Sequence, residues 1–380
     1  MRTLPCDIDA MDSNQLRAPF PWFGGKSRVA HIVWRAFGNV HSYVEPFFGS
    51  GAVLLGRPLP FDGVETINDI DGFVANAWRS LRSKPNETAQ WADNPVNEND
   101  LHARHVWLLK QRAELVSRLE GDSDYYDPKI AGWWMWGVCC WIGTGWCSGK
   151  GPWWPDDESR LARQLPHLGN LGQGVNRKLP HPGNLGQGVN RKLPHPGDGQ
   201  GVNRKLPHLG NGQGVNRKLP HPGDAERTAS LVDWFRALSA RMSRVRVACG
   251  DWSRVCGPSV LRPSGSGYVG VFLDPPYDSA IRCADAYAND SGTVSADVRD
   301  WAIEHGEQPE LRIALCGYDG EHAMPKSWQC IPWKSHGGYG GQGDGRGRDN
   351  ATRERIWFSP ACLLLSKPGS IKHAFYNQAR

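Results

Sequence analysis

An unbroken apolar run over residues 268–273 ends abruptly at Asp274-Pro275-Pro276-Tyr277. A strand that is apolar on both faces is typical of the buried centre of a parallel sheet. Two prolines end such a strand, because proline donates no ladder hydrogen bond and restricts the residue before it. Parallel strands need helical crossovers, so the run predicts an α/β fold. It also places a carboxylate, a proline carbonyl and an aromatic ring at the carboxyl edge of the sheet, where such folds bind ligands.

Two earlier strand ends carry groups that suit a nucleotide-like ligand. The first strand leads into a turn with Phe47, Gly49 and Gly51, here called the glycine turn, and then into a helix. Glycines let the backbone come close to a ligand. A second strand ends at Asp69, 18 residues after Gly51, near the spacing of a carboxylate that binds ribose hydroxyls. Asp71 suits the cap of the following helix, which leaves Asp69 available for a ribose.

A lysine element, Gly25-Lys26-Ser27, stands ahead of these strands and precedes an amphipathic helix. It is similar to the end of a phosphate-binding P-loop, but the first glycine of that loop is replaced by Phe20. A P-loop nucleotide triphosphatase is therefore excluded. Since a lysine at a helix start opposes the helix dipole, Lys26 is either an ordinary solvated lysine or has a separate function.

After residue 230 the sequence again shows the apolar patterns of helices and strands. An apolar helical face is followed by a short strand that ends at Asp251, then by the run at 268–273. Asp251 is either a ligand for the adenine amino group of a cofactor or a turn aspartate. The remaining pattern predicts a helix near 296–305, a buried strand at 311–316 and a final strand at 355–359.

The middle of the chain has a different character. Residues 84–99 are polar and predict a connection, and the next segment is an amphipathic helix with Leu108 and Leu115 on one face. His102 and His105 of this helix are expected at the surface, because no acidic or cysteine partner stands at metal spacing.

A tryptophan-rich stretch and a set of repeats complete the middle of the chain. Residues 131–154 hold seven of the 18 tryptophans, which indicates either a hydrophobic cluster or a surface that stacks on bases. Residues 165–224 repeat a Gly-, Pro- and Asn-rich unit that is too poor in apolar residues to order itself. The repeats hold eight basic and two acidic residues, so they account for the net charge of +5 and leave −1 elsewhere. They are either a phosphate-binding arm or a neutral expansion.

Composition excludes several classes of protein. The 10 cysteines form no CxxC pair and no zinc spacing, so we expect reduced thiols, no metal site and a cytoplasmic location. There is no cleavable signal and no apolar run that could span a membrane, so no membrane association is expected.

The glycine turn, followed much later by the Asp274-Pro275-Pro276-Tyr277 loop, resembles the amino-group DNA methyltransferases. The element Phe23-Gly24-Gly25-Lys26 resembles the Dam-like branch, which is specific for adenine. The resemblance implies a Rossmann-like class I S-adenosylmethionine methyltransferase sheet with helices on both faces and an inserted DNA-recognition region. It also implies double-stranded DNA as partner, in a bacterial cell or a phage-infected host. The expected divisions are a leader (1–18), a catalytic domain (19–85 and 231–380), a helical Trp-rich insert (86–164) and flexible repeats (165–224).

The resemblance also assigns roles to residues. Asp274 and the Pro275 carbonyl would accept the amino hydrogens of a flipped adenine, Pro276 would complete the loop and Tyr277 would stack on the base. The residues expected at S-adenosylmethionine are Trp22 and Lys26 at its methionine part, Phe47, Gly49 and Gly51 along it, Asp69 at its ribose and Asp251 at its adenine.

Other functions remain as alternatives. The acceptor could be the amino group of cytosine, although such enzymes usually have serine at the place of Asp274; RNA and protein glutamine are further acceptors. A non-catalytic DNA-binding decoy is disfavoured by the intact Asp274-Pro275-Pro276-Tyr277 loop. A Rossmann oxidoreductase is disfavoured because leucine stands where the third glycine of its fingerprint belongs.

Overall fold

The computed structural model describes most of the chain outside the repeats. The described residues are 16–22, 24–61, 63–141, 146–147, 153–155, 161–163, 225–262, 267–277, 293–333 and 352–363. The predicted leader lies almost entirely outside these ranges, and the repeats of 165–224 lie wholly outside them. Within the described ranges, no helix has the length and apolar character that a membrane crossing requires.

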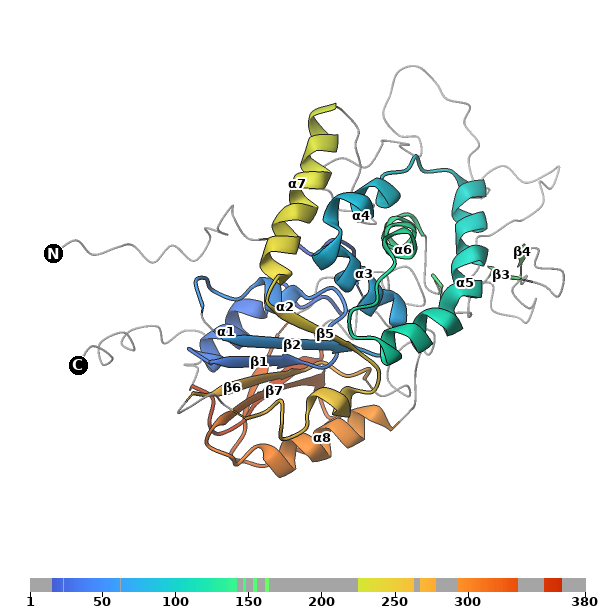
Figure 1. The fold of residues 1–380 in the computed structure, drawn as a ribbon. Helices are drawn as coiled ribbons and strands as arrows, with labels where there is room; N and C mark the ends of the chain where they lie inside the picture. Colours follow the sequence, from blue (N-terminus) through green and yellow to red (C-terminus); the bar gives the residue numbers. More distant parts are fainter. Residues whose placement is uncertain are drawn as a thin grey trace, which may run out of the picture.

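A seven-stranded mixed sheet forms the centre of the protein, in the order β5-β2-β1-β6-β7-β9-β8 (Figure 1). The first five strands in this order are parallel, and β9 is antiparallel to both of its neighbours. The strands are β1 (Ser42–Glu45), β2 (Val64–Asp69), β5 (Val245–Cys249), β6 (Val269–Leu273), β7 (Leu311–Tyr318), β8 (Gln329–Pro332) and β9 (Glu354–Phe358). The predicted α/β fold is confirmed, and the apolar run that precedes Asp274 is the fully buried central strand β6.

Helices cover both faces of the sheet (Figure 1), as expected from the strands that are apolar on both faces. Along β7, Ile313 and Leu315 pack with Val298 of α8 (Val294–His305), while Ala314 and Cys316 belong to the larger core on the opposite face. That larger core also contains residues of α1 (Ala30–Phe37), α2 (Ala52–Leu55), α3 (Gly72–Ser83) and α7 (Ala225–Met242). The sheet is therefore a buried middle layer.

The inserted segment packs against α3 as a group of three helices, which are α4 (Pro85–Ala92), α5 (Glu98–Gly121) and α6 (Pro128–Cys140). The prediction of a mere connection over 84–99 is wrong, because this segment contains α4. Helices α4 and α6 meet closely at Gly132, where a Cβ atom would lie 2.3 Å from the Trp91 Cβ. Trp134 and Trp136 of α6 are buried, which favours a hydrophobic cluster over a base-stacking surface for these two side chains. The short strands β3 (Trp153–Pro155) and β4 (Leu161–Arg163) pair antiparallel beyond them.

His105 lies inside this inserted group, contrary to the sequence prediction of a surface residue. Its side chain is 1% exposed and stacks on Trp141 with ring centroids 4.9 Å apart. The tryptophan-rich stretch folds back over α5 and covers the histidine. Periodicity within α5 alone could not show that a later segment covers this position.

A buried ion network joins α7 to the sheet. Glu65 of β2 lies 2.6 Å from Arg241 Nη1 and 3.0 Å from Arg57 Nη1, measured from its two carboxylate oxygens. All three side chains are almost completely buried. Two arginines on one carboxylate leave the network with a net positive charge, so Glu65 holds both of them in place.

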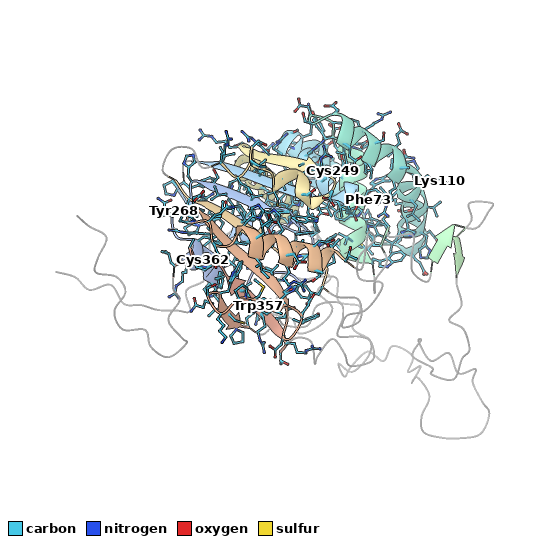
Figure 2. The ribbon with its side chains drawn as sticks, turned by 90° about the horizontal axis from the view of Figure 1, so that it is seen from below. Phe73, Lys110, Cys249, Tyr268, Trp357 and Cys362 are labelled. Carbon is cyan, nitrogen blue, oxygen red and sulfur yellow. The ribbon has the colours of Figure 1, made fainter. Side chains whose placement is uncertain are left out.

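The carboxyl edge of the parallel strands faces the inserted helices. In Figure 2, Tyr268 just before β6 marks the opposite edge, whereas Cys249 at the end of β5 lies beside Phe73 of α3, on the side of Lys110 of α5. The predicted ligand-binding residues follow the strands at this edge. Because β9 is antiparallel, its first residue, Glu354, is paired with Tyr318 at the same edge.

Candidate active site

A chain of four side chains lies at the end of β6. Lys26 Nζ is 2.8 Å from Asp274 Oδ2 and donates to the Gly24 carbonyl at 2.8 Å. The Tyr277 hydroxyl lies 3.1 Å from Asp274 Oδ1 and 2.9 Å from Glu354 Oε2. The structure thus brings together Lys26, Asp274 and Tyr277, which the sequence analysis selected, and adds Glu354.

Burial and nearby charges determine the protonation states of Lys26 and Tyr277. Lys26 is only 4% exposed, so the interpretation as a solvated lysine is wrong. Burial by itself lowers the pKa of Lys26, but the Asp274 and Glu354 carboxyls outweigh that effect and raise the pKa, so the ammonium stays charged. Burial, reinforced by the same two carboxyls, raises the pKa of Tyr277 well above its usual value, so its hydroxyl keeps its proton.

Aromatic rings hold Tyr277 in place while Asp274 stays accessible. Tyr318 meets Tyr277 edge to face with centroids 4.6 Å apart, and Lys26 Nζ lies 5.3 Å from the Tyr277 ring centroid and 5.7 Å from that of Trp333. Tyr277 is 8% exposed, whereas the Asp274 side chain is 19% exposed. Of the two prolines between them, Pro275 is buried and Pro276 partly buried. A ligand can therefore reach the carboxylate, but the ring that flanks it is fixed.

The glycine turn lies directly on Trp22. Gly49 has a φ of +49° and Gly51 a φ of +69°, the left-handed conformation that favours glycine. A Cβ atom on Gly49 would lie 2.4 Å from the Trp22 indole ring. The Gly49 amide donates to Asp69 Oδ2 at 2.9 Å, and its carbonyl accepts from Trp78 Nε1 at 2.9 Å. Three of the residues expected to bind a cofactor, Trp22, Gly49 and Asp69, are thus in one cluster.

Asp69 and Asp71 both accept backbone amides at the end of β2, and only Asp71 caps the following helix. Asp71 caps α3 by accepting the Phe73 amide at 2.9 Å, which confirms its predicted capping role. Asp69 accepts the Asp71 amide at 2.9 Å on its other oxygen. Burial, with the nearby Asp71 charge, raises the pKa of Asp69 to about 7 despite these two hydrogen bonds. Binding of a ribose by Asp69 stays a prediction.

Phe47 and Asp251 lie at the ends of β1 and β5. Phe47 is half-buried and stacks on Trp252 with centroids 6.3 Å apart and an angle of 28° between the rings. Asp251 is exposed and accepts the Ser253 amide at 2.9 Å, so it caps the 3-10 turn Trp252–Val255. Asp251 therefore caps this turn through one oxygen, its side chain is exposed beside Trp252, and its binding to an adenine amino group stays a prediction.

Glu354, Tyr318 and Trp333 were missed as site residues by the sequence analysis. Each stands at the end of a strand: Tyr318 ends β7, Trp333 follows β8 and Glu354 begins β9. An acid directly before the predicted final strand was the available signal. Its use requires the knowledge that β9 is antiparallel, since a parallel strand would place its first residue at the opposite edge.

Comparison with known proteins adds no assignment to this geometry. No protein-family model matches the chain, and no curated protein matches it. Among the residues that the structure describes, no group of three or more His, Cys, Asp or Glu side chains could hold a metal ion.

Proposed function

We propose that the protein transfers a methyl group from S-adenosylmethionine to the exocyclic amino group of an adenine extruded from double-stranded DNA. The observation that carries the proposal is the partly exposed Asp274 carboxylate, held by Lys26 and Tyr277 at the carboxyl end of the central strand. A base inside a duplex cannot reach a recessed carboxylate, so base flipping is part of the proposal.

The chemistry requires acceptors for the amino hydrogens. The amino nitrogen of adenine is a poor nucleophile, because its lone pair is delocalised into the ring. Asp274 and the Pro275 carbonyl accept one hydrogen each, which favours a pyramidal nitrogen with its lone pair directed at the methyl group. A carboxylate has about four lone-pair sites, so the contacts of Asp274 with Lys26 and Tyr277 leave room for the substrate. Positioning and electrostatics therefore supply the acceleration.

The main sheet differs at one edge from the doubly wound sheet of dinucleotide-dependent oxidoreductases. Numbered in chain order, the strands of the main sheet lie 3-2-1-4-5-7-6, with the last strand antiparallel between the fifth and sixth. The doubly wound dinucleotide-binding sheet has the order 3-2-1-4-5-6. The main sheet keeps the 3-2-1-4-5 part of that order and differs from it by the antiparallel strand between its fifth and sixth strands.

The glycine turn and its neighbours are the proposed binding site for S-adenosylmethionine, which supplies the methyl group on a sulfonium centre. Gly49 and Gly51 bring the backbone close to the ligand, and Trp22 forms a wall at Gly49. Asp69 would accept a ribose hydroxyl, and Phe47 lies on the side where Asp251 would receive the adenine. Lys26 is proposed to act on Asp274 rather than mainly on the methionine part, because its ammonium already pairs with that carboxylate.

Substitution of Asp274 tests the proposal. Asp274→Ala and Asp274→Asn should lower methyl transfer to DNA about 100- to 1000-fold, the usual effect of removing one positioned electrostatic contact. Binding of S-adenosylmethionine, measured by calorimetry, should change little. The matched control is Asp319→Ala, which removes an exposed carboxylate after the neighbouring strand β7. Transfer that survives in both Asp274 variants would contradict the proposal.

A further inference from the structure

The Tyr277 hydroxyl has one proton but two carboxyl groups within hydrogen-bond distance. Asp274 Oδ1 is 3.1 Å away and Glu354 Oε2 is 2.9 Å away. A hydroxyl donates one hydrogen and accepts through its oxygen. It can therefore bond to both carboxyl groups at once only when one of them is protonated. The three groups form a chain along which one proton can be carried in either direction.

Glu354 is the inner end of this chain. Its side chain is 4% exposed, so Tyr277 separates it from the accessible carboxylate of Asp274. Burial raises the pKa of Glu354, the Lys26 ammonium opposes this, and Asp274 adds to it. The titratable groups that act on Glu354 or respond to it are Lys26, Asp274, Tyr277, Cys316, Tyr318 and Glu321. A proton on Glu354 is therefore less costly than on an exposed glutamate.

The proposed reaction produces one proton inside this site. The amino nitrogen forms a bond to the methyl carbon, and the carbon–sulfur bond breaks with its electron pair left on sulfur. The nitrogen then carries the positive charge until one of its N–H bonds breaks, with that electron pair left on nitrogen. A group that already accepts an amino hydrogen is the nearest acceptor for this proton.

We propose, on the basis of the proposed function, that Glu354 is the final acceptor of this proton, which it receives from Asp274 through Tyr277. Asp274 takes the proton from the amino group and passes it to the Tyr277 oxygen, while Tyr277 gives its own hydrogen to Glu354. Glu354 does not touch the base and acts through Tyr277, so it is a positioning residue. Asp274 receives the proton first, Tyr277 carries it and Glu354 accepts it, so the transfer requires no further reactant.

The charges of the site balance along this route. Before transfer, both carboxyl groups are ionised and Tyr277 donates to only one of them. The Lys26 ammonium and the sulfonium then balance the carboxylates of Asp274 and Glu354, and the sum is zero. After transfer, Lys26 and Asp274 remain charged, Glu354 is neutral, and the sum is again zero. Burial raises the pKa of the nearby Glu45 well above its usual value, which favours the uncharged form of this side chain. A buried site that keeps zero net charge avoids the large cost of an unpaired charge.

Single-turnover methyl transfer to DNA, measured across pH with saturating S-adenosylmethionine, tests the inference. Glu354→Gln and Tyr277→Phe should each lower the rate about 100-fold, within the usual contribution of positioned proton transfer. The double variant should be no slower than the slower single variant, because both changes cut one path. The wild-type rate should fall at low pH as Glu354 becomes protonated, and Glu354→Gln should lack that fall. Glu354→Asp should restore part of the rate.

The outcomes separate the inference from the function on which it rests. Wild-type transfer with an unchanged rate in Glu354→Gln, or with additive losses in the double variant, overturns the proton route and leaves the proposed function intact. Absence of transfer by the wild-type protein overturns both. Tyr277→Phe blocks the same proton transfer while leaving Glu354 in place. If Glu354→Gln does not fold, an unchanged rate in Tyr277→Phe would therefore overturn the proton route.

Discussion

Gly49→Ala should damage the glycine turn more than its small volume suggests. Alanine at φ +49° is strained by about 1–2 kcal/mol, and its Cβ would lie 2.4 Å from the Trp22 ring. Trp22 cannot easily move, since Phe20 and Trp134 lie 6.0 and 6.1 Å from it between ring centroids. Forced overpacking of this kind costs about 1–3 kcal/mol. The total destabilisation is therefore expected to be about 2–5 kcal/mol.

Two measurements test the predicted effect of Gly49→Ala. Chemical denaturation should give the lower free energy of unfolding, and calorimetry should show that affinity for S-adenosylmethionine falls at least about tenfold, or about 1.4 kcal/mol. The matched control is Gly25→Ala in the lysine element, where a Cβ would meet the Trp22 carbonyl at an ordinary 3.6 Å. If Gly49→Ala equals Gly25→Ala in both measurements, Trp22 does not lie against Gly49 as described.

Two further substitutions probe buried carboxylates. Glu65→Gln should lower the free energy of unfolding by about 3 kcal/mol, because Arg57 and Arg241 would remain buried without their anion; Glu114→Gln, at an exposed ion pair, should change it by less than about 1 kcal/mol. Because burial raises the pKa of Asp69 to about 7, the folded state holds that proton more tightly than the unfolded state, so stability should fall as pH rises from about 4 to 7. Asp69→Asn should flatten that fall, which urea titrations of both proteins at several pH values would measure. If the free energy of unfolding of the two proteins changes with pH in the same way, Asp69 is not the group responsible.

Sequence patterns within a short segment predicted the elements that depend on that segment alone. The central strand β6 followed from an apolar run ended by two prolines, and the cap at Asp71 followed from the preference of aspartate for that position. The glycine turn and the helix after it were also predicted, because glycine at a positive φ has few substitutes.

The remaining features depend on contacts between distant segments. Helix α4 was missed because only Thr88, Ala89 and Ala92 are buried in a polar segment, too few to give a clear apolar period. The strand β8 was missed because only alternate residues of it are partly buried. The role of Glu354 depends on the direction of β9, which the residues of β9 alone do not determine.

The most direct test of the central claim uses the wild-type protein with unmodified duplex DNA and S-adenosylmethionine labelled on the methyl group. After incubation, the DNA is digested to nucleosides and the label is traced by chromatography. The Asp274→Ala variant serves as the control for a contaminating activity. We expect label in the deoxyadenosine methylated on its amino nitrogen, and about 100- to 1000-fold less of it with the variant. Label only in methylated deoxycytidine, or no label in DNA, would contradict it.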